Sequence, residues 1–284
     1  MPRITVVTDS DSSIPVEMAK ALGIVQVPIT IQFGNDSFES GVDIDDRMLF
    51  NRIDATGKLP TTAAPAAGRF VDAFQTAFDK GADSVVCFCV SSKVSASYKS
   101  ACQAQDLLPE RDIAIVDSNS LSMGQGYMAI VANEAAARGA TKNEIIETAL
   151  EINQRTHVYV ALPTLKYLAM SGRVGYLTAG MANILSVKPI LTIKAGKLEV
   201  LQRVRTQPKA LARVVELAQQ STGGRPVERL AIVHVNAAAE AEKLYASLCS
   251  HIACPELVTY AELTPGLSVH AGNGVVGVVL VTAR

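Results

Sequence analysis

Hydroxyl-bearing and acidic side chains gather in short clusters directly after three apolar runs of this sequence. The clusters cover residues 8–13, 91–97 and 117–122. In an open α/β sheet, ligands bind outside the carboxyl ends of the strands, where hydroxyls and free helix N–H groups converge on one acidic group. The pattern therefore predicts the polar rim of a pocket that binds an anion.

The first cluster also resembles an enzyme motif. Asp9, Ser10 and Asp11 follow an apolar run, as in aspartate-dependent phosphatases, where one carboxylate attacks phosphorus and the next serves as acid and base. Such enzymes need further acidic residues after a later strand to hold magnesium. The strand predicted at 230–235 is followed by Asn236, which is not acidic. A phosphatase using Asp9 and Asp11 remains the alternative function, against a simpler interpretation in which Asp9 and Ser10 cap a helix or fix a turn.

Two glycine-containing segments approach a dinucleotide-binding pattern. Residues 272–277 match G-x-G-x-x-G, but they precede the last predicted strand instead of opening a helix. Residues 124–129 lie between a strand and a helix, yet the next predicted strand, at 157–162, has no acidic residue to bind a ribose. A nucleotide-binding regulatory protein is therefore a third hypothesis.

One short segment contains cysteine and histidine residues that are typical metal ligands. Cys249, His251 and Cys254 offer three soft ligands within a short stretch, but no fourth ligand stands nearby, which favours a core or surface placement. The five cysteines are an odd number at irregular spacing, which predicts reduced thiols instead of a disulfide framework. His270 lies in a predicted loop whose glycines allow a ligand to approach the backbone closely, so it is a candidate binding residue.

Composition limits the class of protein. The chain has 284 residues, 49% hydrophobic and 19% charged, enough for two ordinary domains with a substantial core. The formal charge is −1, which provides no broad positive surface for nucleic acid or an anionic membrane. No apolar run approaches the roughly 20 residues that span a bilayer, and no signal peptide is visible at the start. We expect a cytoplasmic protein with no membrane span and no nucleic-acid partner.

The elements that position these residues alternate in the first half of the chain. Strands are predicted at 4–8, 25–33, 84–90 and 113–117, and helices at 15–22, 45–55, 67–80, 95–107 and 126–138. This alternation predicts βαβ units and a mainly parallel sheet. Thr141 and Glu144 form a capping box that opens a further helix, to about residue 154.

The second half of the chain predicts a mixed sheet with helices on one side. Strands are expected at 157–162, 189–193, 197–204, 230–235, 257–262 and 275–282, with a hairpin turn at 194–196. A short helix and a Gly-containing segment at 171–175 follow the first of these strands, and longer helices are expected at 208–220 and 238–249. The fold class is α/β with two domains, 1–155 and 156–284.

Taken together, these segments resemble the DegV family of bacterial lipid-binding proteins, which includes the fatty-acid-binding subunits of fatty acid kinase. Residues 62–65 resemble the family's Thr-Ser-x-Pro, 91–98 its Ser-Ser-x-Leu-Ser-Gly-Thr-Tyr, 171–174 its Gly-Gly-Arg-Ile and 270–274 its His-x-Gly-x-Gly. Residues 7–10, 117–118, 124–126, 187–191 and 203–206 complete the resemblance, which runs along essentially the whole chain. The chain departs from the family pattern at Ala63, where a hydroxyl residue is common, and at Ala96, where glycine is usual.

The resemblance implies a two-domain EDD fold and a long-chain fatty acid as the only ligand, without catalytic activity, cofactor or metal. The carboxylate would be contacted at the domain junction by Thr62, Ser95, Arg205 and His270, the last two adding positive charge. The implied partners are the catalytic subunit of a fatty acid kinase, which would phosphorylate the presented carboxylate, and an acyl-phosphate acyltransferase. The absence of a P-loop match agrees with a partner doing the chemistry. Secondary contacts with ligand or partner are expected from Arg173, Asp9, Ser10, Ser92 and Gly272.

Overall fold

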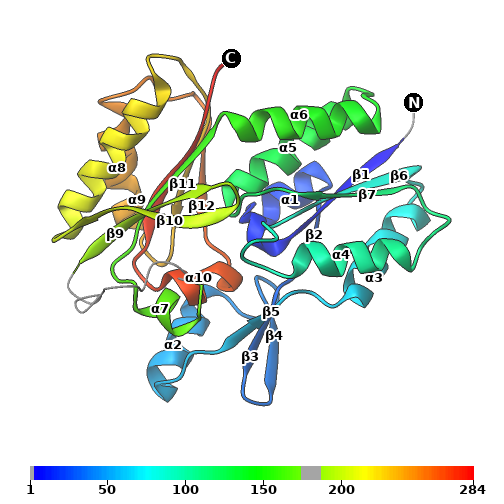
Figure 1. The fold of residues 1–284 in the computed structure, drawn as a ribbon, viewed down its shortest axis with the longest axis horizontal. Helices are drawn as coiled ribbons and strands as arrows, with labels where there is room; N and C mark the ends of the chain where they lie inside the picture. The colour runs from blue at the N-terminus through cyan, green and yellow to red at the C-terminus, as the bar shows by residue number, and fades with distance from the viewer. Residues whose placement is uncertain (1–2, 174–186) are drawn as a thin grey trace. The chain divides into compact units, whose positions relative to one another are not determined.

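The computed structural model describes residues 3–173 and 187–284 (Figure 1). Val174 and Gly175 of the predicted Gly-containing segment lie outside the described residues. The chain divides into two compact units. The N-terminal unit holds the residues up to Ile44 and Thr61–Gln154, and the C-terminal unit holds Asp45–Pro60 and the chain from Arg155 onward. The segment Asp45–Pro60 therefore belongs to the C-terminal unit, which the order of elements along the sequence did not indicate.

The N-terminal unit is built on a four-stranded parallel sheet, as the alternating pattern predicts. Its strands run in the order β2-β1-β6-β7. Helices α3 and α4 cover one face and α5 and α6 cover the other (Figure 1). The bounds are β1 (Ile4–Asp9), α1 (Val16–Leu22), β2 (Val25–Val27), α3 (Ala67–Asp79), β6 (Ser84–Cys89), α4 (Ser97–Asp106), β7 (Ile113–Asp117), α5 (Met123–Ala137) and α6 (Lys142–Gln154).

Phenylalanines of α3 fill the core on one side of this sheet. Phe70 and Phe74 are fully buried against Val85 and Cys87 of β6. Each such side chain stabilises the fold by roughly 1.5–3 kcal/mol relative to an exposed one. The core therefore fixes α3 and α4 on the sheet, and with them the segments that precede each helix.

The single strand expected at 25–33 is wrong, because the chain breaks at Pro28. Proline has no backbone N–H to continue a ladder. Residues before it form β2, while β3 (Thr30–Phe33) pairs antiparallel with β4 (Asp36–Glu39) and β5 (Thr61–Ala63) in a separate three-stranded sheet. The strands β4 and β5 were not predicted, because both are short and polar.

The C-terminal unit has a six-stranded mixed sheet, also as predicted. The order is β10-β9-β8-β13-β11-β12; β11 and β12 run parallel, and the other described pairs run antiparallel. The turn between β9 and β10 has positive φ at Ala195 and Gly196, as a two-residue type I′ hairpin requires. The strands are β8 (Thr156–Ala161), β9 (Lys188–Lys194), β10 (Lys197–Val204), β11 (Val227–His234), β12 (Val258–Glu262) and β13 (Val276–Thr282).

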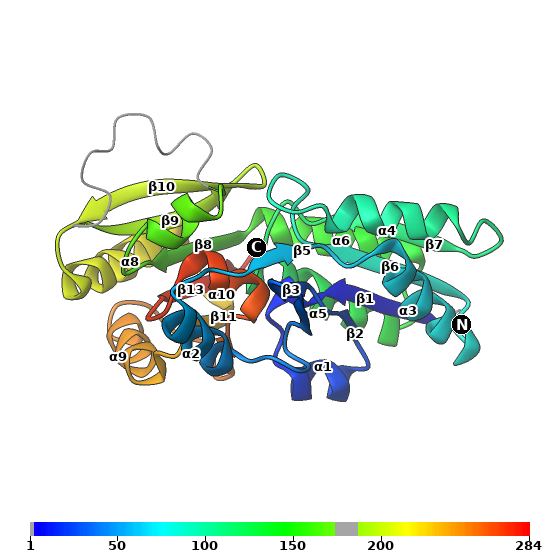
Figure 2. The same ribbon diagram turned by 90° about the horizontal axis from the view of Figure 1, so that it is seen from below.

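Helices of two kinds belong to the C-terminal unit. The longer α8 (Gln207–Thr222) and α9 (Ala238–Cys249) pack on the sheet through Val214 and Leu244, which are buried with Ile232 of β11. Shorter helices lie together, α2 (Asp46–Thr56), α7 (Lys166–Met170) and α10 (Pro265–Ala271), as Figure 2 shows for α2 and α10. Within the described ranges, no helix is long and apolar enough to cross a membrane.

Candidate functional site

Asp9 lies at the end of β1 and is fully buried. Its Oδ1 accepts hydrogen bonds from the N–H of Asp11 at 3.1 Å and from Nε2 of Gln125 at 3.0 Å, and its Oδ2 accepts from the N–H of Val90 at 2.8 Å. Burial raises the pKa of Asp9 to about 6, and these hydrogen bonds limit the rise. A buried carboxylate held by three donors has no path to the phosphorus of a substrate. Its role as the cap of the 3₁₀ turn Ser10–Ser12 is confirmed, and the geometry argues against the phosphatase.

Most of the other hydroxyls in the predicted rim are also interior. Ser10 Oγ accepts from the N–H of Ile29 at 3.0 Å, and Thr8 Oγ1 donates to the carbonyl of Phe88 at 2.9 Å. These hydrogen bonds cross-link the strand ends. The buried hydroxyls of the three clusters are Thr8, Ser10, Ser12, Ser13, Ser91, Ser97, Ser118, Ser120 and Ser122.

Gly126, in the first turn of α5, allows close packing of the helix. A Cβ added at Gly126 would lie 2.8 Å from the carbonyl oxygen of Ser12. The side chain of Gln125 between the glycines is fully buried and engaged with Asp9. The segment at 124–129 thus brings α5 against the turn after β1, which explains its glycine without a nucleotide phosphate.

Thr62 and Ser95 are the two hydroxyls of the predicted carboxylate site, and both are half-buried in the N-terminal unit. Thr62 lies on β5 opposite Ile31, shortly before α3. Ser95 Oγ lies 3.0 Å from Ser97 Oγ and accepts from the N–H of Ser97 at the start of α4. Neither α3 nor α4 has a side-chain hydrogen bond from its N-cap residue, so the first-turn N–H groups favour a nearby anion.

Two further features of this region bear on the family pattern. Ala96 stands where glycine is usual, but its φ is −86°, a conformation that needs no glycine. Ser92 is exposed, and its N–H donates to Oδ1 of Asp117 at 3.2 Å. The loop before α4 is therefore fixed to the end of β7 by its backbone.

His270 lies near the carboxyl end of α10, so the loop predicted for it is wrong. Burial, together with the positive charge of Arg173, lowers the pKa of His270 to about 4. The imidazole is therefore neutral at pH 7, and the expectation that it adds positive charge is wrong for the protein without ligand. A neutral imidazole still offers one N–H donor and one acceptor.

Gly272 follows α10 with a φ of +90°, and a Cβ there would lie 2.5 Å from Cδ2 of Tyr167. Tyr167, on α7, also meets the ring of Phe50 on α2 edge-to-face, with centroids 6.1 Å apart. In the structure, the ring of Tyr167 is the group that lies close to the backbone of Gly272. This contact holds α10, and His270 with it, against α7.

The two arginines of the predicted site are exposed and lie in the C-terminal unit. Arg205 follows β10 directly, and Arg173 follows α7, where its Nη1 donates to the carbonyl of Ser171 at 2.7 Å. Guanidinium groups keep their charge at every physiological pH. In the protein without ligand, Arg173 and Arg205 therefore carry positive charge, whereas His270 is neutral.

A buried carboxyl group beside α10 was not predicted. Ser268 Oγ lies 2.8 Å from Oδ2 of Asp46 and 3.3 Å from the carbonyl oxygen of Leu263, and Asp46 is only 3% exposed. Burial raises the pKa of Asp46 to about 8, helped by the negative charges of Glu262 and Asp45 and opposed by the Ser268 hydrogen bond. Because Asp45 is the N-cap of α2, an acidic residue next to it is typical of an ordinary helix start and gives no sign of this contact.

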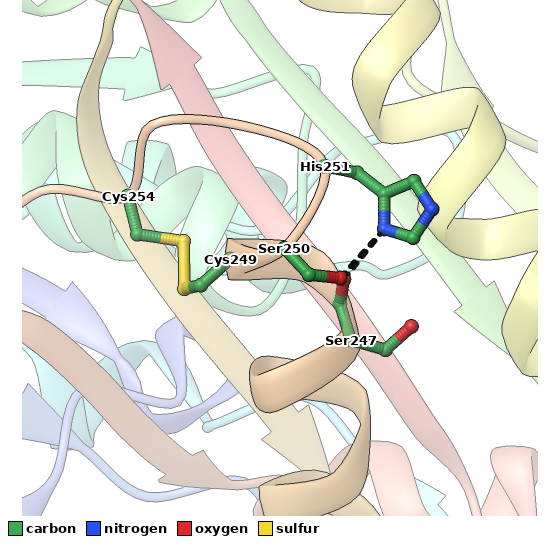
Figure 3. Close-up of a disulfide and its surroundings, with 5 residues drawn as sticks. All are labelled: Ser247, Cys249, Ser250, His251 and Cys254. Carbon is green, nitrogen blue, oxygen red and sulfur yellow. Dashed lines mark hydrogen bonds between the residues drawn. A yellow bond between two sulfur atoms is a disulfide. The ribbon is translucent and has the colours of Figure 1, made fainter.

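The expectation of five reduced cysteines is wrong, because Cys249 and Cys254 form a disulfide (Figure 3). Helix α9 ends at Cys249, and the following residues turn back to bring the two Cα atoms within 5.4 Å. Cys87, Cys89 and Cys102 are free thiols. Among the residues that the structure describes, no group of three or more His, Cys, Asp or Glu side chains is arranged to hold a metal ion.

Comparison with known proteins identifies the family. A model described as "Uncharacterised protein, DegV family" matches residues 3–283. A DegV domain-containing protein of Caldanaerobacter subterraneus subsp. tengcongensis is 32% identical over 279 residues, which is 98% of each chain. The structure of a DegV family protein from Thermus thermophilus, described for its fatty acid binding, is 26% identical and superposes with a TM-score of 0.92 over 99% of this chain and 100% of that one. DegV of Bacillus subtilis, described as a fatty acid binding protein, is 26% identical, with a TM-score of 0.88 over 100% of both chains. The chain therefore belongs to the DegV family.

Proposed function

We propose that this protein binds a long-chain fatty acid and presents the carboxylate to a separate kinase. The observation that carries the proposal is the match, along the whole chain, to two structures of DegV proteins described as binding fatty acids. The side chains proposed to contact the carboxylate are Thr62, Ser95, Arg205 and His270, and Arg173 and Gly272 are proposed to contact the ligand or the partner.

The chemistry of these residues suits a carboxylate. An ionised head group removed from water costs several kcal/mol unless donors or cations replace its hydration. Thr62 and Ser95 offer hydroxyl donors close to helix starts whose N-cap residues, Ala66 and Ala96, make no side-chain hydrogen bond. Arg205 offers a permanent cation, and neutral His270 can gain a proton when a carboxylate approaches. Proton uptake on binding is therefore part of the proposal.

The acyl chain would provide most of the affinity. Burying one methylene is worth about 0.8 kcal/mol, so a tail of ~16 carbons gains on the order of 12 kcal/mol before ordering costs. The head group then fixes orientation, with each charge-assisted hydrogen bond worth about 1.5–3 kcal/mol.

The kinase is proposed because a bound carboxylate held by hydroxyls and cations is ready for transfer of a phosphoryl group. The chain carries no P-loop sequence of its own, in keeping with a catalytic subunit that supplies ATP. An acyl-phosphate acyltransferase would then receive the product. The proposed role for this chain is to bind the substrate and carry the acyl phosphate, without catalysing the reaction.

Binding of a fluorescent fatty acid to single variants tests the site. Thr62→Ala, Ser95→Ala and Arg205→Ala are expected to weaken binding about 10- to 100-fold each, the equivalent of one charge-assisted hydrogen bond. Thr61→Ala is the matched control, because Thr61 is the exposed neighbour of Thr62 on β5 and should bind as the unmodified chain does. Unchanged affinity in all three site variants would refute the assignment of the carboxylate contacts.

The kinase step is tested separately, with ATP and the catalytic subunit of a bacterial fatty acid kinase. The lipid-loaded chain should yield acyl phosphate, detected as the hydroxamate after treatment with hydroxylamine. A chain that binds fatty acid but yields no acyl phosphate with any such subunit would refute the presenting role and leave the binding role intact.

A further inference from the structure

The disulfide Cys249–Cys254 lies at the surface of the C-terminal unit. Both cysteines are only half-buried. Of the four residues between them, Ser250, His251 and Ala253 are exposed and Ile252 is half-buried. In Figure 3 the imidazole of His251 points away from the sulfur atoms, toward the Ser250 hydroxyl, to which it is hydrogen-bonded at 2.9 Å. The sulfur atoms are therefore not covered by the imidazole of this loop.

The bond joins the end of α9 to the segment that leads into β12. Strand β12 is the edge of the six-stranded sheet, and its described pairing is with β11. Just before it, Leu257 is 87% exposed. The disulfide thus holds an edge strand and a loop to a helix end. In this segment Ile252, Cys254 and Val258 pack, partly buried, against the core, whereas His251 and Leu257 are exposed.

The core of the unit does not depend on this bond. Helix α9 is anchored by Leu244 and Leu248, which are buried with Ile232 and Val278 of the sheet. The loop that the bond closes is short, with a sequence separation of 5, so its constraint on the unfolded chain is at the low end for disulfides. A bond needed mainly for folding would instead close a long loop or replace a missing core.

The other thiols show a different environment. Cys87 and Cys89 alternate on β6 with their sulfur atoms 3.8 Å apart, yet both are fully buried and remain thiols. Cys102 is half-buried and is also a free thiol. Among the described cysteines, only Cys249 and Cys254 combine a formed disulfide with access from solvent.

We propose that Cys249 and Cys254 form a reversible thiol–disulfide modification site, whose reaction partner is a dithiol reductant. A thiolate of the reductant attacks one sulfur, forms a mixed disulfide and releases the other cysteine as a thiolate. The second thiolate of the reductant then attacks the reductant's own sulfur in the mixed disulfide, which closes the disulfide of the reductant and releases the remaining protein cysteine as a thiolate. Two electrons and two protons pass to the protein, which gains two thiols, and the reverse reaction with an oxidised dithiol restores the bond.

Reduction is expected to open a local region and leave the rest of the unit folded. Without the bond, residues 250–257 lose their covalent tie to α9, and the start of β12 is held by its pairing with β11. Local opening of this kind is detected by hydrogen exchange, because amides exchange at the rate at which their own segment opens.

Reduction of the folded, full-length chain with dithiothreitol, followed by iodoacetamide and peptide mass spectrometry, tests the proposal. The expected result is alkylation at Cys249 and Cys254 only after reduction, no alkylation at Cys87 and Cys89, and full recovery of the disulfide with oxidised dithiothreitol. Exchange at 250–262 should accelerate roughly tenfold or more in the reduced protein, while α5 and β13 keep their protection.

Controls make each outcome decisive. Cys102→Ser should behave as the unmodified chain, which excludes exchange with the third accessible thiol. The double variant Cys249→Ser with Cys254→Ser should show the fast exchange without reductant and no further response to it. The proposal is overturned if reduction needs denaturant, if Cys87 is alkylated together with Cys249, or if the two thiols of the purified chain cannot be oxidised to a disulfide.

Discussion

The Asp46→Asn variant is expected to gain stability relative to wild type as the pH rises. The difference in unfolding free energy, variant minus wild type, should be larger at pH 8 than at pH 5. Burial raises the pKa of Asp46 from 3.8 to about 8. A raised pKa means that the folded protein holds a proton that the unfolded chain releases. The contribution of this carboxyl to stability is therefore complete below pH 3.8 and is lost progressively as the pH rises to about 8.

The geometry supports the protonated form. The hydroxyl of Ser268 has one proton and two acceptors in reach, Oδ2 of Asp46 and the carbonyl oxygen of Leu263. Ser268 Oγ is the donor toward both acceptors, and its single proton cannot serve both fully, so this hydrogen bond offsets only part of the cost of burying an ionised Asp46. An ionised Asp46 would also leave its buried Oδ1 without a donor among the described residues.

The magnitude follows from the linkage relation. Each pH unit between the unfolded and folded pKa costs the wild-type chain about 1.4 kcal/mol, so the interval from pH 5 to pH 8 costs about 4 kcal/mol. The asparagine of the Asp46→Asn variant cannot ionise and escapes this cost. Its amide, placed where Asp46 Oδ1 has no partner, adds a constant cost of about 1–3 kcal/mol at every pH.

Urea unfolding followed by circular dichroism at pH 5, 6, 7 and 8 measures the effect. The difference in unfolding free energy between Asp46→Asn and wild type should grow steadily with pH. Asp54→Asn is the matched control on the same helix, where the carboxylate is exposed, and its difference from wild type should stay flat. An Asp46→Asn difference that is the same at pH 5 and pH 8 would refute the reasoning.

Three further predictions follow from the same contacts. In Asp9→Asn the amide NH₂ group faces a donor, either the N–H of Val90 or one of the other donors, so the free energy of unfolding in urea should fall by about 1–3 kcal/mol. Loss of a metal-dependent phosphatase activity would instead favour the enzyme alternative. Gly272→Ala should cost about 1–3 kcal/mol, and Tyr167→Ser should recover part of it in a double-mutant cycle, so strictly additive effects would argue against the tight contact. His270 should stay neutral down to about pH 4 in an NMR titration of the lipid-free protein, and a midpoint near its ordinary 6.5 would contradict the burial argument.

Local signals in the sequence predicted the regular elements well. The Thr141–Glu144 capping box forms as expected, with the Glu144 carboxylate accepting from both the N–H and the hydroxyl of Thr141. Helix α9 has the predicted bounds, and the turn at Ala195 and Gly196 closes a hairpin. Each of these features is determined by interactions between residues a few positions apart, so the local sequence is enough to predict it.

Features that depend on distant residues were not predictable in this way. Asp46 and Ser268 are 222 positions apart, and only the folded chain shows that the carboxyl is buried against α10. The pKa of His270 likewise depends on burial that no local pattern reports. The disulfide was not predicted because the spacing of Cys249 and Cys254 does not show how the chain turns after α9.

The carboxylate site itself rested on family resemblance. The sequence indicated hydroxyl clusters after strands, but it did not separate the interior Thr8 and Ser10 from Ser95, which is only half-buried beside an uncapped helix start. That distinction depends on which side chains the neighbouring strands cover. The family, the α/β fold and the longer elements were therefore accessible from the sequence. The short strands β4 and β5, helix α10 and the chemistry of individual side chains required the structure.

Native mass spectrometry of the chain purified from a bacterial host, with solvent extraction of whatever is bound, tests the central claim most directly. Binding of a fatty acid predicts one long-chain acid per chain, removed by extraction and regained on adding the free acid. A chain that emerges without lipid and shows neither a mass adduct nor a higher melting temperature with any long-chain acid would contradict the account.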